Sequence, residues 1–185
     1  MITKIRLQNW KSFKDSTIYI DSLGILIGTN ASGKSNVLDA FAFLRSVGEG
    51  KSLLDAIQTV RGGEDWIIRR GENTFCLELE VENEGSSYLL DLRVIRKDSV
   101  FSYGPCEIHR IGIGDDDVVP GKFMDSARNI LWKTYGVSES LDFWAKIYAT
   151  LRSIIILDPV PAKMRDYCKI SKELKSDGSN VAGVL

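Results

Sequence analysis

An eight-residue stretch, GTNASGKS at residues 28–35, constrains this chain more than any other feature. It fits the phosphate-loop pattern G-x-x-x-x-G-K-[ST]. The apolar run at residues 23–27 precedes it and predicts a buried strand, because strands covered on both faces are apolar almost throughout. A helix is predicted after it, from apolar residues at three- and four-residue steps: Val37, Ala40, Phe41, Leu44 and Val47. Strand, glycine loop and helix in this order predict a site for nucleotide phosphate.

The residue types of this loop suit the binding of phosphate. Gly28 and Gly33 allow a tight turn in which successive N–H groups point inward toward anionic oxygens. The helix that follows adds its unpaired N–H groups and the positive end of its dipole. Lys34 would reach the β- and γ-phosphates, and the hydroxyl of Ser35 would occupy one position around Mg²⁺. The competing interpretation is a glycine turn that opens an ordinary helix.

Composition describes an ordinary globular protein. The 185 residues suffice for one domain with a core, and the net charge of −1 provides no overall basic field for nucleic acid, although a local patch stays open. Three widely spaced cysteines without a C-x-x-C pair argue against a disulfide framework or a zinc site and favour a reducing cytoplasm: Cys76, Cys106 and Cys168. The N-terminus is unlike a signal peptide, and no apolar run is long enough to span a bilayer. We expect a cytoplasmic protein without membrane contact.

Two short strands are predicted before the loop, at residues 2–7 and 17–20, whereas a simple kinase or small GTPase places its loop after the first strand. Residues 9–13, NWKSF, and residues 28–40, GTNASGKSNVLDA, resemble the start of an ABC-type ATPase head of the SMC/RecF/OLD-like group. The chain is most similar to the stand-alone "AAA family" predicted ATPases of bacteria and archaea. The generic loop pattern does not fix three residues that carry this resemblance: Asn30, Ser32 and Asn36.

This resemblance implies an α/β P-loop NTPase fold, in the form of an ABC/SMC-like N-terminal lobe with a mixed central sheet. Residues 1–185 would form one lobe, with an antiparallel β-subdomain at 64–111 and a helical region, a strand and the start of a further helix at 120–185. The implied ligands are ATP and Mg²⁺, with Ser35 on the metal. The implied nucleotide-binding residues are Gly28, Thr29, Asn30, Ala31, Ser32, Gly33, Lys34, Ser35, Asn36 and Arg61. No catalytic residue is assigned.

Arg61 follows a second predicted helix, in which apolar residues again recur at helical spacing: Leu53, Leu54, Ile57 and Val60. By its position it matches an arginine that approaches nucleotide or DNA in heads of this group. An equal alternative is a helix-terminal arginine that satisfies carbonyl groups before the glycine stop at residues 62–63.

Residues 66–110 predict an antiparallel meander, with strands at 75–81, 88–96 and 100–110. Its charged residues are interpreted as a solvent face, and the acidic ones are not expected to be paired catalytic carboxylates: Glu78, Glu80 and Glu82. The basic ones form either a solvated face or a strip for nucleic acid: Arg69, Arg70, Arg93, Arg96 and Lys97. His109 has no metal-ligand partners at useful spacing, and the aspartates at 115–117 lack the spacing of a calcium loop.

The C-terminal third predicts helices at 122–135 and 140–151, the latter with an apolar stripe that includes Ile147 and Leu151. Residues 153–158, SIIILD, resemble a Walker B strand, but Pro159 follows Asp158 where ABC heads carry a glutamate. The preferred alternative is a strand followed by a short helix. Residues 176–180, SDGSN, resemble an ABC signature but are expected to cap a helix at 181–185, with Asp177 or Ser179 at the N-cap. The chain then stops on apolar residues, which suggests a cut.

The resemblance implies an ATP-driven dimerisation switch that serves DNA repair, maintenance or phage defence. Hydrolysis would need a C-terminal lobe and a second head, and DNA or a nuclease or other effector would be further partners. The alternative from another class is a self-contained P-loop kinase or nucleotide hydrolase that acts on a small molecule. A GTPase is disfavoured because the D-x-x-G at residues 21–24 precedes the loop and no N-K-x-D occurs. An inert scaffold that keeps the loop without binding nucleotide is the last alternative.

Overall fold

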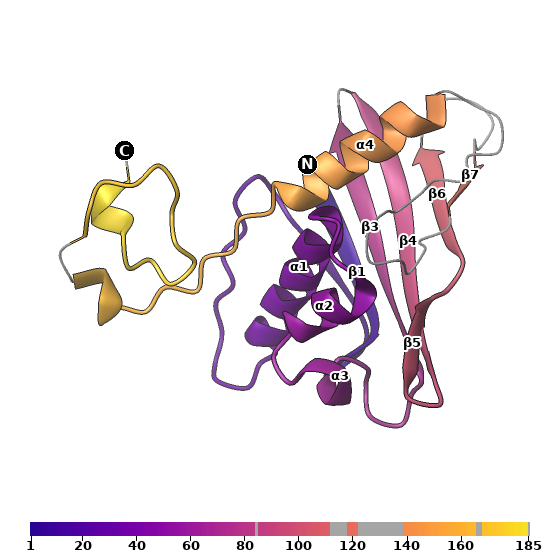
Figure 1. The fold of residues 1–185 in the computed structure, drawn as a ribbon, viewed down its shortest axis with the longest axis horizontal. Coiled ribbons are helices and arrows are strands. Elements are labelled where there is room, and N and C mark those ends of the chain that lie inside the picture. The colour runs from indigo at the N-terminus through magenta and orange to yellow at the C-terminus, as the bar shows by residue number, and fades with distance from the viewer. Residues whose placement is uncertain (84, 112–117, 122–138, 166–167, 185) are drawn as a thin grey trace. The chain divides into compact units, whose positions relative to one another are not determined.

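An antiparallel sheet with helices on one face makes up most of the computed structural model, which describes residues 1–83, 85–111, 118–121, 139–165 and 168–184 (Figure 1). The chain divides into two units, Met1–Ser153 and Ile154–Leu185, and we describe each by itself. The predicted helix at 122–135 and the aspartates at 115–117 lie outside the described residues.

The sheet of the first unit has the strand order β2-β1-β3-β4-β6-β7, and β5 also pairs with β4. Every pairing of these strands is antiparallel, which confirms the predicted meander from residue 74 onward. Their bounds are β1 (Ile2–Trp10), β2 (Phe13–Tyr19), β3 (Thr74–Asn83), β4 (Ser86–Lys97), β5 (Val100–Tyr103), β6 (Cys106–Ile111) and β7 (Val118–Gly121). The first part of the predicted meander is wrong, since the short helix α3 (Gly63–Trp66) stands there and only Ile68 bridges to Trp10.

Three helices confirm the helical spacing read from the sequence: α1 (Lys34–Gly48), α2 (Leu53–Gln58) and α4 (Glu139–Arg152). They lie on the same face of the sheet, with α4 crossing α1 and β3 (Figure 1). Ser52 caps α2 by accepting a hydrogen bond from the backbone N–H of Asp55. On α4, Ile147 and Leu151 are buried as the predicted stripe requires.

The core forms where the inner residues of the strands meet α1. Ile5 of β1 pairs with Leu79 of β3, which pairs with Leu90 of β4, and all three are fully buried. An aromatic cluster joins the sheet to α1, with ring centroids 5.0 to 5.8 Å apart: Trp10, Phe43 and Phe75. On α1, Phe43 is fully buried in this cluster, whereas Phe41 is half-buried.

The opposite face of the sheet is polar, as the alternation along β1 and β3 predicts. Arg6 bonds both carboxylate oxygens of Asp15 and also faces Glu78, while Lys4 faces Glu80. The hydrogen bond from Arg6 holds the pKa of Asp15 below its usual value. These contacts agree with a solvent face of neutralising pairs.

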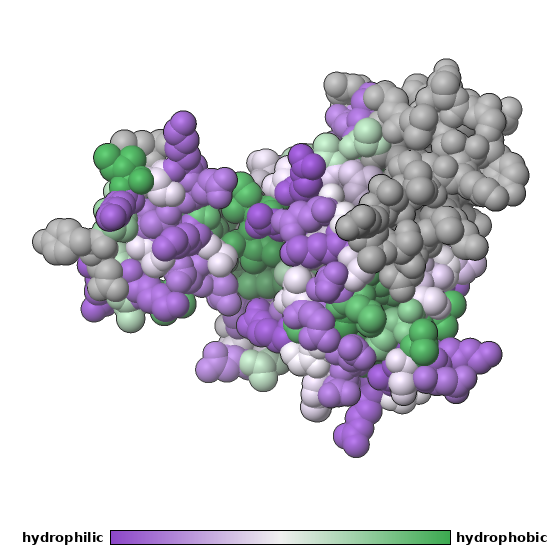
Figure 2. Space-filling view, viewed as in Figure 1, coloured by the Kyte–Doolittle hydropathy of each residue, from purple (hydrophilic) through white to green (hydrophobic). Residues whose placement is uncertain are grey.

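The prediction of a buried strand at residues 23–27 is wrong. In the described structure this run belongs to no strand, and Leu23, Ile25 and Ile27 are 74%, 73% and 90% exposed. A parallel strand is buried when other elements cover both of its faces, and the exposure of these side chains shows that the described residues do not cover this run. Apolar side chains that reach the surface of the chain appear as the green areas of Figure 2.

The second unit contains two 3₁₀ helices, η1 (Lys163–Arg165) and η2 (Val181–Gly183). The strand predicted at 153–158 is wrong: the run is not a strand, and Ile155 is 75% exposed. Buried Asn180 holds this unit together by accepting from Lys175 N–H and donating to the carbonyl of Glu173.

A candidate nucleotide-phosphate site

The glycine loop turns directly into α1, as the phosphate-loop pattern predicts. Gly33 is the N-cap of α1 and has φ of +94°, a left-handed conformation that glycine adopts without strain. Its carbonyl accepts the N–H groups of Asn36 and Val37, which starts the helix. Ala31 is also left-handed, with φ of +63°, and residues 28–32 are exposed. The loop thus bends sharply and leaves its backbone open to solvent.

Lys34 lies with its ammonium group over this loop. Its Nζ donates to the carbonyls of Gly28 at 2.7 Å and Thr29 at 2.6 Å and approaches the hydroxyl of Ser32 at 3.3 Å. An ammonium group has three donors, so these contacts engage all of them. A Cβ on Gly28 would come within 3.0 Å of Ser32 Oγ, so a glycine here keeps the loop narrow. The positive charge stands beside the open backbone.

The first turn of α1 supplies groups that suit an anion and a metal ion. The first N–H groups of any helix lack acceptors within the helix, and Gly33 has no side chain to cap them. Ser35 is exposed at this end. No group of three or more His, Cys, Asp or Glu residues in the described ranges could hold a metal ion alone. Mg²⁺ commonly takes few protein ligands and completes its shell with phosphate and water, so the Ser35 hydroxyl fits that role.

Asn36 connects the loop to the turn between β1 and β2. Its side-chain amide donates to Ser12 Oγ at 2.7 Å, and its backbone carbonyl accepts a hydrogen bond from the indole N–H of Trp10 at 2.7 Å. The ring of Phe13, at the end of the same turn, lies against Gly33. The turn therefore supports the loop from one side, and the amide of Asn36 is engaged with it.

Arg61 lies beside the first turn of α1. Its Nε donates to Asp39 Oδ1 at 2.9 Å, and its Nη2 lies 3.4 Å from the carbonyl oxygen of Ser35. Arg61 thus contacts α1 near the loop, and the carbonyl group that it approaches belongs to α1. Lys11 bonds the same carboxylate. Sequence reasoning missed Lys11 and Asp39; the available signal was a carboxylate within the apolar pattern of a helix.

Other titratable groups do not join this site. Burial, with a hydrogen bond to Asp91, raises the pKa of the Cys76 thiol to about 12, which leaves it an inert thiol. Arg93 pairs with Asp91, and Arg96 lies over the ring of Phe101. Because residues three apart on a strand face opposite sides, Arg93 and Arg96 do not form one basic strip. His109 lies on β6, and its side chain is outside the described set.

Asp158, the alternative Walker B residue, belongs to the second unit, where its backbone N–H donates to the carbonyl of Ser176. Asp177 accepts the N–H of Ser179 and bonds Lys163, which together lower its pKa to about 2. The N-cap of η2 is Asn180, so the prediction of Asp177 or Ser179 as the cap is wrong.

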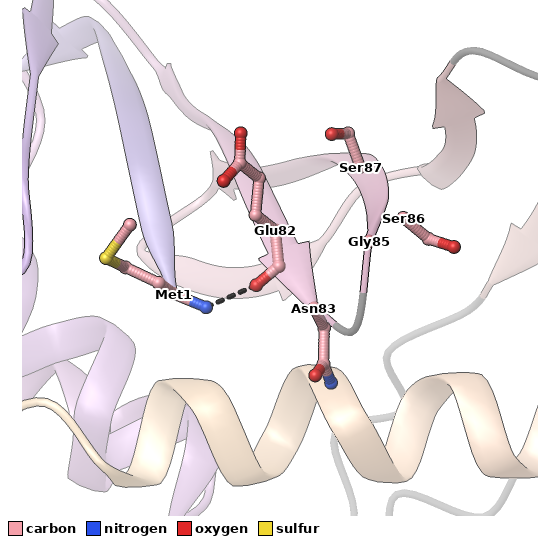
Figure 3. Close-up of a pocket in the computed structure, with 6 residues that line it drawn as sticks. All are labelled: Met1, Glu82, Asn83, Gly85, Ser86 and Ser87. Atoms are coloured by element: carbon pink, nitrogen blue, oxygen red, sulfur yellow. Dashed lines mark hydrogen bonds between the residues drawn. The ribbon is translucent and has the colours of Figure 1, made fainter.

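A cavity of about 430 Å³ lies elsewhere, at the end of the sheet (Figure 3). Its lining comes from the N-terminus, the end of β3 and the start of β4: Met1, Glu82, Asn83, Gly85, Ser86 and Ser87. The Met1 ammonium donates to the carbonyl of Glu82 there. None of the predicted nucleotide-binding residues lines this cavity.

None of the described helices is both long and apolar enough to cross a membrane.

Comparison with known proteins identifies relatives of this chain. The chain is 34% identical over 113 residues to the DNA double-strand break repair Rad50 ATPase of Thermoplasma volcanium, a match that covers 60% of this chain and 11% of that protein. It is 26% identical over 175 residues to the same-named protein of Sulfolobus acidocaldarius, covering 94% of this chain and 17% of the relative. The chromosome partition protein Smc of Methanococcus voltae is 42% identical over 53 residues, 28% of this chain and 4% of the relative.

The chain thus spans less than a fifth of the length of these relatives. The matches confirm the resemblance to the N-terminal lobe of SMC/Rad50-like, ABC-type ATPases that residues 9–13 and 28–40 suggested. The model of the AAA ATPase domain family matches residues 1–141, which include the loop, α1 and Arg61. The chain belongs to the AAA ATPase domain family.

Proposed function

We propose that this chain is the ATP-binding N-terminal lobe of an ABC/SMC-like ATPase with a P-loop NTPase fold. One observation carries the proposal: left-handed Gly33 turns an exposed glycine loop into α1, with the Lys34 ammonium hydrogen-bonded to carbonyls of that loop. Loop N–H groups and the first turn of α1 together offer an anion a set of donors and a positive dipole end. A polyphosphate would replace the carbonyls as the partner of Lys34.

Within this proposal, the backbone of residues 28–33 wraps the β-phosphate, and Lys34 bridges the β- and γ-phosphates. Ser35 provides one ligand to Mg²⁺, whose remaining ligands would come from phosphate and water. Bound Mg²⁺ would neutralise charge on the phosphates. Asn36 acts through its bond to Ser12, and Arg61 approaches the same end of α1.

The lobe would work with a C-terminal lobe and a second head. The exposed apolar run at 23–27, which leads into the loop, supports a further lobe. Its side chains suit a strand that other elements cover on both faces, and a C-terminal lobe would provide that cover. We propose that ATP-dependent head dimerisation serves DNA repair, maintenance or phage defence, with DNA or a nuclease or other effector as a further partner. The Rad50 relatives are named for DNA double-strand break repair and the Smc relative for chromosome partition, which supports the first two roles. Cys76 and Cys168, the two cysteines whose side chains the structure describes, form no disulfide, which supports a cytoplasmic location.

Calorimetric titration of the chain with ATP and Mg²⁺ tests nucleotide binding. We expect saturable binding that Lys34→Ala weakens at least about tenfold, or about 1.4 kcal/mol, since a charge-assisted contact to phosphate is lost. Lys14→Ala, which removes an exposed lysine from β2, is the matched control and should bind like wild type. Ser35→Ala should reduce the gain in affinity that Mg²⁺ provides. Absence of ATP binding, or binding that Lys34→Ala leaves unchanged, would refute the proposal.

Hydrolysis by this chain alone should be negligible, because no ABC signature or Walker B glutamate is recognised among the 185 residues. Phosphate release with ATP and Mg²⁺ measures it. Turnover comparable to that of a whole ATPase, abolished by Lys34→Ala, would contradict this part of the proposal and favour a self-contained enzyme.

A further inference from the structure

Asp39 is a buried carboxylate shared by two cations from distant parts of the chain. It lies one helical turn after Ser35 on α1, and its side chain is 5% exposed. Lys11, from the turn between β1 and β2, bonds one carboxylate oxygen, and Arg61 bonds the other. A buried charge is tolerated only when it is paired, so these contacts account for the presence of Asp39 inside the fold.

The two cations differ in their surroundings. The Lys11 side chain is 9% exposed, whereas the Arg61 side chain is 54% exposed. Lys11 also donates to the backbone carbonyl of Arg61 at 2.8 Å, which fixes the backbone from which Arg61 extends. Lys11 therefore neutralises the carboxylate within the fold, and Arg61 adds a second positive charge at the surface.

The bond to Asp39 sets the direction of the Arg61 guanidinium. A guanidinium is a rigid planar fork, so fixing its Nε–H on Asp39 Oδ1 orients the remaining N–H groups. One of them, on Nη2, comes within 3.4 Å of the Ser35 carbonyl, at the end of α1 that follows the loop. The carboxylate of Asp39 thus stands between two cations, and one of them, Arg61, lies beside the candidate phosphate site.

We propose that Asp39 is a positioning residue that holds the Arg61 guanidinium beside the first turn of α1, where the guanidinium meets the polyphosphate of bound nucleotide. The inference rests on the proposed function, because it assumes that ATP binds at the loop. It assigns to Asp39 an effect on affinity exerted through Arg61, beyond any contribution to folding.

A double-mutant cycle on the 185-residue chain tests this inference, with the affinity for ATP and Mg²⁺ measured by calorimetry. Asp39→Asn and Arg61→Gln should each weaken binding about tenfold, and the double variant should bind no more weakly than Arg61→Gln alone. Arg61→Lys should not restore affinity, because lysine lacks the planar fork. Arg45→Gln removes an arginine from the far end of α1 and serves as the charge control. Losses that multiply in the double variant would overturn the inference.

Asp39→Asn leaves Lys11 buried without its charged partner and can fail to fold for that reason. A second pair of variants avoids this: Lys11→Met keeps Asp39 and Arg61 together, and Lys11→Met/Asp39→Asn leaves no buried charge. The double variant should bind ATP about tenfold more weakly than Lys11→Met, and equal affinities would overturn the inference. If wild type itself does not bind ATP, the proposed function fails; if wild type binds and the Asp39 variants bind equally well, only the positioning role fails.

Discussion

Phe13 lies so close to Gly33 that a Cβ built on Gly33 would stand 2.9 Å from Cζ of the ring. The contact joins the start of β2 to the residue that caps α1. It places an apolar wall on one side of the glycine loop, opposite the open backbone of residues 28–32. Gly33 therefore satisfies two demands together, a left-handed backbone and room for an aromatic ring.

Replacing Gly33 by alanine should destabilise the fold and abolish nucleotide binding. The left-handed φ costs about 1–2 kcal/mol for a residue with a Cβ, and the clash with Phe13 adds to it. Gly50→Ala is the matched control, because Gly50 has φ of +77° and no atom near its would-be Cβ. Chemical denaturation and ATP titration measure both variants. A Gly33→Ala protein as stable as Gly50→Ala, with ATP affinity intact, would contradict the geometry described here.

Phe43 should contribute far more to stability than its near neighbour Phe41. Phe43→Ala removes a fully buried ring from contact with Trp10 and Phe75, which costs about 3–5 kcal/mol. Phe41 is half-buried, and its replacement by alanine should cost about 1 kcal/mol. Urea denaturation curves compare the two, and equal losses would show that the core does not run through Phe43.

Cys76 should resist alkylation at neutral and mildly alkaline pH. With a pKa near 12, roughly one thiol in ten thousand is ionised at pH 8, and only the thiolate attacks iodoacetamide. Asp91→Asn removes the carboxylate that accepts a hydrogen bond from the thiol, so it should lower the pKa of Cys76 and speed its alkylation. Mass spectrometry of Cys76-containing peptides follows the rate, with denatured protein as the reference. Folded wild type that reacts as fast as denatured protein at pH 8 would argue against this burial.

Low pH should destabilise the second unit by protonating the Asp177 carboxylate. The folded pKa of Asp177 is about 2, below its usual value of 3.8, so its stabilising bonds to Ser179 and Lys163 are fully present above that usual value. They are lost as the pH falls through the folded value. An NMR titration of the Asp177 carboxyl measures the pKa directly, and Asp177→Asn should remove the pH dependence in this window. A midpoint at the usual value would rule out these bonds in solution.

Local patterns in the sequence predicted the parts of the fold that depend on local physics. Alternation along β3 separated buried Leu77 from ion-paired Glu78, and three- and four-residue steps located α1 and α4. The prediction of a buried strand at 23–27 was wrong because burial depends on which other elements cover the strand. Apolar composition carries no information about those elements.

The candidate site divides in the same way. The loop, its left-handed Gly33 and the position of Lys34 follow from a contiguous motif. The contacts of Asp39 could not be predicted, since its partners Lys11 and Arg61 lie 28 and 22 positions away along the chain. Which cation meets a buried carboxylate is decided by the packing of β1 and α2 around α1.

The exposure of Leu23, Ile25 and Ile27 also affects how much of the chain a cell can produce before it aggregates. An exposed apolar stretch can pair with an unpaired sheet edge of another chain, and such pairings grow into aggregates. Under the proposed function, simultaneous synthesis of the proposed C-terminal lobe in equal amount would limit this aggregation. Production in excess should direct the surplus toward chaperones and insoluble material.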